Sequence, residues 1–330
     1  MPEPFESHAD GYIKWLRDHV GHELIYLVYT TSLVFDDAGR ILVQRRYDFD
    51  WLGLPGGALE VGEGLRAGAI RETAEETGIQ IAVERLVGVF SHPDFNLLYP
   101  TGDRVQQWSV CMVARPVGGQ LHADGGETLD VFWMPVDEAM PQFPPAYRAM
   151  VQAAFESPGA AVLEPVYTQE PPIPHYPILR EHIKHECIIL PGVMAVIRND
   201  AGEVLVARRT DFDAYDIPGG FCDLGETTTA TVIREVREET GLEVEPLRVV
   251  GVYSENMLFT YPNGDEVHGV GIAFECRITG GTLRADHDEI SEVRFAPLST
   301  LLTQPEAPGM SGMMQLWRDI QQPETWPVIR

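Results

Sequence analysis

The sequence predicts an α/β (α+β) fold made of two tandem units. A stretch at 56–78 reads GGALEVGE…RETAEETG and returns at 219–241 as GGFCDLGE…REVREETG. Around both copies, segments rich in Val, Ile and Thr alternate with helical patterns, which is typical of domains that combine a sheet with helices. A chain of 330 residues is long enough for about two domains, so each copy predicts one domain.

A short amphipathic helix is predicted near the start of each unit. The first lies at 12–20, and the segment at 179–186 matches 16–23 in the same register as the two glycine-rich stretches. The repeat therefore begins well before these stretches.

A β-hairpin is predicted next in each unit. Residues 24–35 are rich in Val, Thr, Tyr and Leu, the turn sequence DDAG follows at 36–39, and 41–45 returns as a second arm. Asp, Asn and Gly tolerate the positive φ angles of hairpin turns. The second unit repeats the pattern with arms at 193–197 and 204–208.

The elements after the glycine-rich stretch also recur. They comprise two strands, two hairpin turns and two closing helices, at 86–91 and 249–254, at 99–103 and 261–265, and at 146–155 and 311–320.

The repeated stretch predicts a loop followed by a helix with carboxylates on one side. Glu72, Glu75 and Glu76 are spaced three and four residues apart, so they project from one stripe of a helix. The second unit repeats this stripe with Glu235, Glu238 and Glu239.

Two further features shape this helix. Gly78 and Gly241 are expected to end the helices, because glycine adopts the left-handed conformation at least cost. Ile70 and Ile233 are expected on the opposite, core-facing side.

An acidic stripe of this kind is often only a solvated helix face. If the carboxylates converge in a cleft instead, two of them about 4 Å apart repel by about 4 kcal/mol at an effective dielectric near 20. A hard divalent cation would then be the natural counter-charge.

The spacing of the repeated stretch decides between these interpretations. A chance match to its seven fixed residues is on the order of 10⁻⁸ at a given start, and the chain contains two matches. Both resemble the Nudix box of the Nudix hydrolase family, with Thr73 as a mild departure where the second copy has Val236.

The resemblance implies a fold and a division of the chain. Each unit would be a Nudix-like α/β/α sandwich with a mixed sheet, in domains at 1–156 and 179–330. The segment 157–178 between them is expected to be a semi-rigid connector, because its prolines oppose helices and central strands. These prolines are Pro158, Pro165, Pro171, Pro172, Pro174 and Pro177.

The resemblance also implies an activity, namely hydrolysis of the pyrophosphate bond of a nucleoside diphosphate linked to a moiety X, with Mg²⁺ or Mn²⁺ bound. The implied metal ligands are Glu72, Glu75, Glu76 and the carbonyl of Gly56, and in the second unit Glu235, Glu238, Glu239 and the carbonyl of Gly219. The neighbouring glutamates would be oriented by Arg71 and Arg234, and this network would be completed by Glu63, Glu226, Gly57 and Gly220. Which glutamate acts as the base varies within the family and stays open.

Residues outside the box are candidates for further roles. Arg46 and Arg209 occupy the same place beside each box, and in so acidic a chain they are candidate contacts to substrate phosphates. Glu127 and Glu289 also correspond and are candidates for an additional carboxylate, although the alternative is a surface acid before a strand.

Composition limits the partners. The chain has 50 acidic and 24 basic residues, a net charge of −26 and a pI near 4.6, whereas binding nucleic acid requires Lys and Arg against phosphates. We therefore expect a small nucleotide substrate and no nucleic acid. Glu3, Glu6 and Asp10 are unlike a signal peptide, so we expect no membrane partner and a cytoplasmic location.

Neither unit has lost an acidic residue of the box, so both are expected to be active. ADP-ribose, dinucleoside polyphosphates, nucleotide sugars and (deoxy)nucleoside triphosphates all remain open, and different X groups at the two sites are a hypothesis. The alternatives are a nucleotide-sensing protein without turnover and an isomerase of isoprenoid type. The isomerase would use a catalytic cysteine, but Cys222 corresponds to Leu59 and is expected to serve packing.

Two expectations concern assembly and redox state. The chain would be either a monomer that acts as an internal pseudo-dimer or a homodimer. Its cysteines are far apart and form no C-x-x-C pair, so we expect them to be reduced and mostly buried. They are Cys111, Cys187, Cys222 and Cys276.

Overall fold

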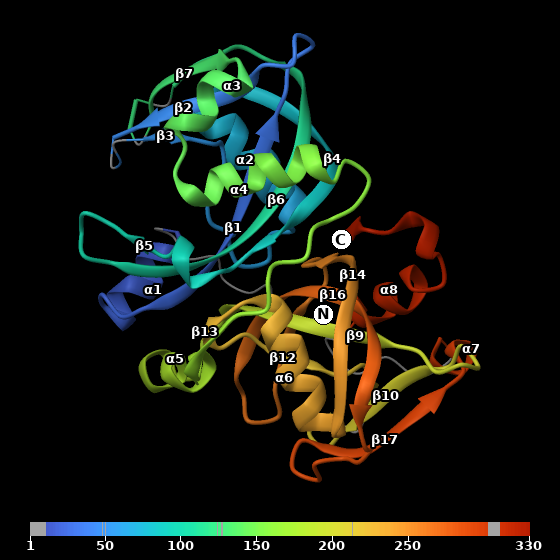
Figure 1. The fold of residues 1–330 in the computed structure, drawn as a ribbon. Coiled ribbons are helices and arrows are strands. Elements are labelled where there is room, and N and C mark those ends of the chain that lie inside the picture. The colour runs from blue at the N-terminus through green and yellow to red at the C-terminus, as the bar shows by residue number, and fades with distance from the viewer. Residues whose placement is uncertain are drawn as a thin grey trace.

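A computed structural model describes two halves joined by one crossing of the chain (Figure 1), one drawn in blue and green and the other from yellow-green to red. The described residues are 11–47, 49, 51–123, 125–126, 128–212, 214–302 and 311–330.

The first half is built around a mixed sheet with the strand order β1-β6-β4, in which β5 also pairs with β6. Strand β6 (Arg104–Gly119) runs parallel to β1 (Ile25–Val34) and antiparallel to β4 (Ile79–Phe90) and β5 (Leu97–Leu98). A second, antiparallel sheet has the order β3-β2-β7. Its strands are β2 (Ile41–Arg46), β3 (Leu52–Gly53) and β7 (Thr128–Met134).

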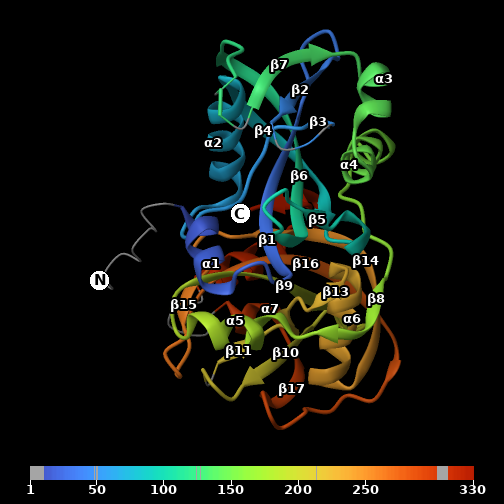
Figure 2. The same ribbon diagram turned by 90° about the vertical axis from the view of Figure 1, so that its left-hand side faces the viewer.

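Helices cover both faces of the first mixed sheet. Figure 2 shows α2 (Leu65–Thr77) on one side of it, and α3 (Val136–Ala139) and α4 (Pro145–Glu156) on the other. Successive residues of β6 enter opposite layers: Val110 lies in the cluster that contains the buried side chains of α2, whereas Cys111 lies in the cluster that contains those of α4. The α/β/α sandwich with a mixed sheet is therefore confirmed.

The second half repeats this architecture with the sheet order β12-β9-β16-β14-β18, in which β15 also pairs with β16. Its strands are β9 (Ile188–Ile197), β12 (Gly219–Phe221), β14 (Leu242–Tyr253), β15 (Leu258–Thr260), β16 (Glu266–Gly281) and β18 (Val328–Ile329). Two smaller sheets have the orders β11-β10-β17 and β13-β8. Their strands are β8 (Thr168–Ile173), β10 (Val204–Arg209), β11 (Tyr215–Asp216), β13 (Leu224–Glu226) and β17 (Ile290–Ala296).

The remaining helices are one at the start of each half, the box helix of the second half, and two near the C-terminal end of the second half. They are α1 (Tyr12–Val20), α5 (His175–Ile183), α6 (Thr228–Thr240), α7 (Leu298–Leu301) and α8 (Ser311–Asp319).

Several local predictions are confirmed. Gly78 and Gly241 end the box helices in the left-handed conformation, with φ of 70° and 68°. The turns at 99–103 and 261–265 join β5 to β6 and β15 to β16 as antiparallel pairs. All four cysteines are buried and free.

The hairpin predicted from 24–35 and 41–45 is wrong. Strand β1 pairs with β6 and β2 pairs with β3 and β7, and the two arms share only the bridge between Phe35 and Ile41. The same holds for β9 and β10, which share the bridge between Arg198 and Val204. The turn forms as predicted, but each arm finds its longer partners elsewhere in the chain.

The core-facing position predicted for Ile70 is also wrong, because the residue is 41% exposed. Leu65, Ala69 and Thr73 make the buried face of α2 instead. Ile233 is partly buried and packs against the core, as expected.

The segment expected as a connector is more structured than its prolines indicate. Strand β8 pairs antiparallel with β13 in a two-stranded sheet, and an edge position of this kind tolerates proline. The helix predicted at 179–186 begins earlier, at His175.

The two halves share one hydrophobic cluster and exchange hydrogen bonds. The Tyr12 hydroxyl accepts the N–H of Ile189 at 3.0 Å, and His175 Nε2 accepts the N–H of Tyr26 at 3.1 Å. These contacts correspond, because His175 and Ile189 are the counterparts of Tyr12 and Tyr26 in the repeat. The halves thus make the intramolecular contact that an internal pseudo-dimer requires.

No helix among the described residues is both long enough and apolar enough to cross a bilayer.

The buried imidazole of His175 predicts a pH-dependent stability. Burial lowers the pKa of His175 to about 3 in the folded chain, whereas an unfolded histidine titrates near 6.5. The unfolded state therefore binds the extra proton below pH 6.5, and this part of the free energy of unfolding falls by roughly 1.4 kcal/mol per pH unit. Urea titrations between pH 7.5 and 5.0 should show this loss.

His175→Gln is the matched control, because its amide oxygen can accept the N–H of Tyr26 but does not titrate. We expect a smaller stability loss in this variant over the same pH range. Equal slopes in both proteins would contradict the assignment.

Candidate active sites

Glycines at the start of each box let the loop approach the sheet and the box helix. Gly56 has φ of +148°, and a Cβ there would lie 2.0 Å from the main-chain oxygen of Thr30. A Cβ at Gly57 would lie 2.4 Å from Cδ of Glu72. In the second half, a Cβ on Gly220 would likewise lie 2.5 Å from the Glu235 carboxylate. Glycine therefore leaves room for one carboxylate of each box.

Arg71 links the box loop to the box helix in the first half. Its Nε and Nη2 donate to the two carboxylate oxygens of Glu63, both at 2.7 Å. Its Nη1 donates to Glu72 at 2.7 Å and to Glu75 at 3.1 Å. A planar guanidinium suits this forked contact, which fixes the Glu72 carboxylate.

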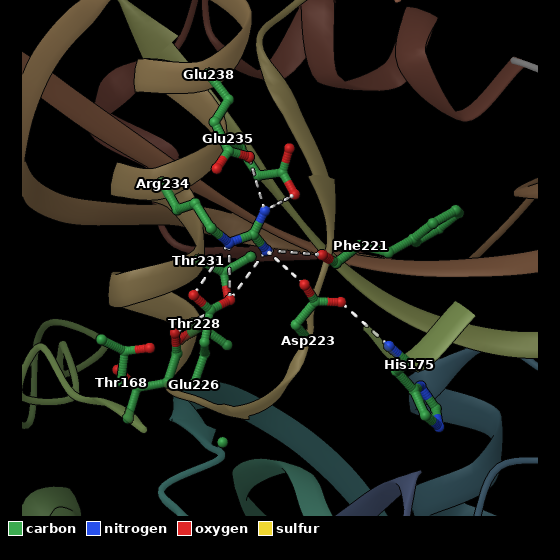
Figure 3. A network of polar contacts seen from close by, with 12 residues as sticks. Thr168, His175, Phe221, Asp223, Glu226, Thr228, Thr231, Arg234, Glu235 and Glu238 are labelled. Carbon is green, nitrogen blue, oxygen red and sulfur yellow. Dashed lines mark hydrogen bonds and ion pairs between the residues drawn. The ribbon is translucent and has the colours of Figure 1, made fainter. Parts of the chain in front are cut away.

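Arg234 makes the same contacts in the second half (Figure 3). Its Nε and Nη2 donate to Glu226, and its Nη1 donates to Glu235 at 2.8 Å and to Glu238 at 3.1 Å. The Asp223 carboxylate also lies 3.7 Å from Nη2. Both halves therefore contain the complete arginine–glutamate network.

Glu76 is buried and points back toward the glycine loop. Its carboxylate accepts hydrogen bonds from the N–H of Gly56 at 2.8 Å, from Gln44 at 3.1 Å and from Arg46 at 3.2 Å. Only 6% of the residue is exposed, and this burial raises its pKa to about 7.

The corresponding Glu239 has different neighbours. It accepts the N–H of Gly219 at 2.9 Å, but the place of Gln44 is taken by Ala207. Burial first, and also the nearby Glu235 and Asp216 carboxylates, hold its pKa well above the usual value. Asp216 itself has a pKa raised by burial to about 6. The second site therefore gathers more negative charge than the first.

The two candidate phosphate-binding arginines also differ. Arg46 contacts the Glu76 carboxylate, whereas Arg209 makes a two-point contact with Asp211 at 2.9 and 2.6 Å. A substrate phosphate at Arg209 would have to compete with this aspartate.

The candidate extra carboxylates can be placed only in part. Glu289 lines the cavity of the second site and acts electrostatically on Glu235. Glu127 lies outside the described residues.

The box glutamates fit a hard divalent cation by the chemistry of their oxygens. Within the described parts of the chain, however, no three acidic, His or Cys side chains are arranged so that they could hold an ion. Glu72 and Glu76 are turned toward Arg71 and the Gly56 N–H instead. The donor set therefore fits a metal, but a coordination sphere is not formed.

Aromatic side chains line the cavity next to the first site, which has a volume of about 610 Å³. Phe49 and Trp51 stack with their ring centres 4.6 Å apart, and Tyr99 lies 5.4 Å from Phe49. The hydroxyls of Tyr29 and Tyr99 are 3.0 Å apart. This wall offers both flat apolar surface and polar atoms to a ligand.

The second cavity, of about 690 Å³, is lined by Met194 and Gly271, where the first half has two hydroxyl side chains. In the first half, the hydroxyls of Thr31 and Ser109 hydrogen bond at 2.7 Å. Met194 and Gly271 replace them, and a Cβ on Gly271 would lie 2.7 Å from the Met194 methyl group. The two cavities therefore present different surfaces.

Sequence reasoning missed Gln44, Asp216 and Asp211. Gly53 and Asp216 occupy the same place in the repeat, but no local sequence signal indicates that Asp216 approaches a box glutamate.

Single units of this chain are similar to known enzymes. An ADP-ribose pyrophosphatase of Methanocaldococcus jannaschii is 32% identical over 127 residues, which are 37% of this chain and 71% of that protein. A putative 8-oxo-dGTP diphosphatase of Bacillus subtilis is 32% identical over 104 residues, or 32% of this chain and 64% of that protein. A NAD-capped RNA hydrolase NudC of Vibrio atlanticus is 31% identical over 115 residues, or 34% of this chain and only 39% of that protein.

Two solved structures each match part of this chain. An ADP-ribose pyrophosphatase from Streptococcus suis matches 42% of this chain and 95% of its own, with 24% identity and a TM-score of 0.33. A MutT protein from Methanosarcina mazei matches 42% and 98%, with 21% identity and a TM-score of 0.34.

The family model of the NUDIX domain matches residues 26–154 and again 189–317. Each match spans a complete box with its arginine–glutamate network. Since the two matches cover most of the sequence, the chain belongs to the NUDIX family and contains two tandem NUDIX domains.

Proposed function

We propose that both domains hydrolyse the pyrophosphate bond of nucleoside diphosphate derivatives with a divalent cation bound. The observation that carries this proposal is the presence in both halves of the arginine–glutamate network, together with a buried glutamate held by the N–H of the loop glycine. Similarity to an enzyme that is named as an ADP-ribose pyrophosphatase supports it. We also propose a cytoplasmic location and the domain boundaries given above.

The chain's own residues would orient the reacting groups. Mg²⁺ or Mn²⁺ would be held by Glu72, Glu75 and Glu76, or by Glu235, Glu238 and Glu239, and would neutralise charge on the phosphate oxygens. In the first site, Arg71 fixes the Glu72 carboxylate and the Gly56 N–H fixes Glu76. Arg46, beside Glu76, is our candidate for a phosphate contact.

We propose that the two sites prefer different X groups. The first cavity combines the stacked rings of Phe49 and Trp51 with hydroxyl groups, whereas the second replaces a Thr–Ser hydrogen bond with Met194 and Gly271. Relatives that are named for ADP-ribose, 8-oxo-dGTP and NAD-capped RNA define the first substrate panel.

A turnover assay with single-site variants tests the function. In Glu76→Gln and Glu239→Gln the amide keeps the shape of the side chain but removes a negative charge from a candidate ligand. We expect each variant to lose one of two activities and the double variant to lose at least about 100-fold of the total. Chromatography of products from ADP-ribose, 8-oxo-dGTP, NAD-capped RNA, dinucleoside polyphosphates and nucleotide sugars would measure this.

Metal dependence is the control for this experiment. Removal of divalent ions with a chelator should abolish turnover, and added Mg²⁺ or Mn²⁺ should restore it. Tight nucleotide binding by the wild type without metal-dependent turnover of any substrate would instead favour a nucleotide-sensing protein.

A substitution at Trp51 tests the role of the aromatic wall. With Glu239→Gln present, so that only the first site works, Trp51→Ala should raise KM about 2- to 12-fold, because an aromatic contact contributes about 0.5–1.5 kcal/mol. Steady-state kinetics on the preferred substrate would measure the change.

Trp51→Phe is the matched control and should retain most of the affinity. With Glu76→Gln present instead, Trp51→Ala should leave the second site unchanged. An equal effect on both sites would show that Trp51 acts through overall stability.

A further inference from the structure

The first turn of each box helix is capped by a serine from the opposite half. Leu65, the first residue of α2, donates its N–H to Ser254 Oγ at 2.9 Å. Thr228, the first residue of α6, donates its N–H to Ser91 Oγ at 3.1 Å. In both helices the N-cap residue makes no side-chain capping bond of its own. The serines therefore satisfy N–H groups that a helix leaves without an internal partner.

A second pair of contacts holds the box loops. Gly62 donates its N–H to His268 Nδ1 at 3.3 Å, and Gly225 donates its N–H to Gln106 Oε1 at 2.8 Å. His268 Nε2 lies 3.1 Å from the main-chain oxygen of Ser254 in the same half. Gln106 Nε2 donates to the main-chain oxygen of Ser91 at 2.9 Å. In each half, the capping serine and the side chain bound to its main-chain oxygen thus contact the loop of the other half together.

These contacts are reciprocal. In the repeat, Thr228 is the counterpart of Leu65 and Ser254 is the counterpart of Ser91. His268 likewise corresponds to Gln106, once the deletion that precedes it in the second unit is taken into account. The same pair of contacts therefore forms in both directions between the halves. The loop N–H is accepted by a histidine in one direction and by a glutamine in the other.

The contacted N–H groups lie on both sides of the loop glutamate. Gly62 and Leu65 enclose Glu63, which holds Arg71 at 2.7 Å. Arg71 in turn fixes the Glu72 carboxylate. In the second half, the contacts of Gly225 and Thr228 enclose Glu226 in the same way. A shift of the loop would therefore move the arginine and the box carboxylate together.

A side chain of the second half also packs against the first loop. A Cβ on Gly64 would lie 3.0 Å from Cγ of Glu255, the residue after Ser254. Besides its hydrogen bonds, the first loop is therefore held by close packing against the opposite half.

We propose that each half positions the catalytic loop of the other: Ser254 and His268 act on the first site, and Ser91 and Gln106 act on the second. Neither half then forms a complete site alone. This inference rests on the proposed hydrolysis only for its kinetic readout, because the contacts themselves can be measured without substrate.

The kinetic test uses the full-length chain with one site silenced. With Glu239→Gln present, Ser254→Ala should lower kcat of the first site about tenfold with little change in KM, since small misplacements of reacting groups are costly. With Glu76→Gln present, Ser254→Ala should leave the second site within about twofold of its starting rate. Ser91→Ala should give the opposite pattern, and the matched Ser→Thr variants, which keep the hydroxyl, should restore turnover.

Hydrogen exchange gives the second, substrate-free readout. Ser254→Ala should accelerate exchange in a peptide that spans 60–68 and leave 223–231 unchanged, and Ser91→Ala should do the reverse. If the wild type turns over no substrate but this crossed pattern appears, the proposed hydrolysis fails and the reciprocal positioning stands. If Ser254→Ala instead impairs the second site, or leaves exchange at 60–68 unchanged, the reciprocal positioning is overturned.

Discussion

The ion pair between the box arginine and the loop glutamate is the interaction on which both sites depend. In the second half, only 2% of the Glu226 side chain and 16% of the Arg234 side chain are exposed. Removing one partner of such a buried pair would leave an uncompensated charge at a cost of about 3–5 kcal/mol. Because the same guanidinium also contacts Glu235 and Glu238, the pair fixes the loop, the helix and the candidate metal ligands as one unit.

Local signals in the sequence were sufficient for most of the elements. The box helices end at Gly78 and Gly241 because a left-handed residue is needed there, and the acidic stripe follows from helical spacing alone. The prediction of the two hairpins was wrong because of strand pairing. A turn sequence at 36–39 indicates that the chain reverses, but not that β1 finds a better partner in β6, which lies far along the chain beyond the box helix and β4. The choice between local and distant strands depends on tertiary packing.

The surroundings of Glu76 and Glu239 likewise depend on tertiary packing that local sequence signals do not show. Gln44 lies opposite Gly53, and Ala207 lies opposite Asp216, in corresponding strand pairs. A Cβ on Gly53 would be 3.0 Å from Cγ of Gln44, so a larger residue at this position favours a smaller one opposite. The exchange is therefore coupled, and it replaces an amide that donates to Glu76 by a carboxylate that raises the pKa of Glu239. Sequence alone shows both differences but not that they face each other.

Duplication within one chain explains how the two sites can diverge while their loops stay mutually dependent. In a homodimer, one substitution changes both copies of an interface, so a histidine in one direction and a glutamine in the other could not coexist. In this chain, His268 and Gln106 each accept one loop N–H, so the two halves use different side chains for the same contact. The cavities have diverged in the same way, at Thr31 and Met194. What the halves still share is the set of loop N–H groups that each donates to the other half. Because these groups flank the glutamates that hold Arg71 and Arg234, the interface has to keep acceptors for them whichever substrate each cavity takes.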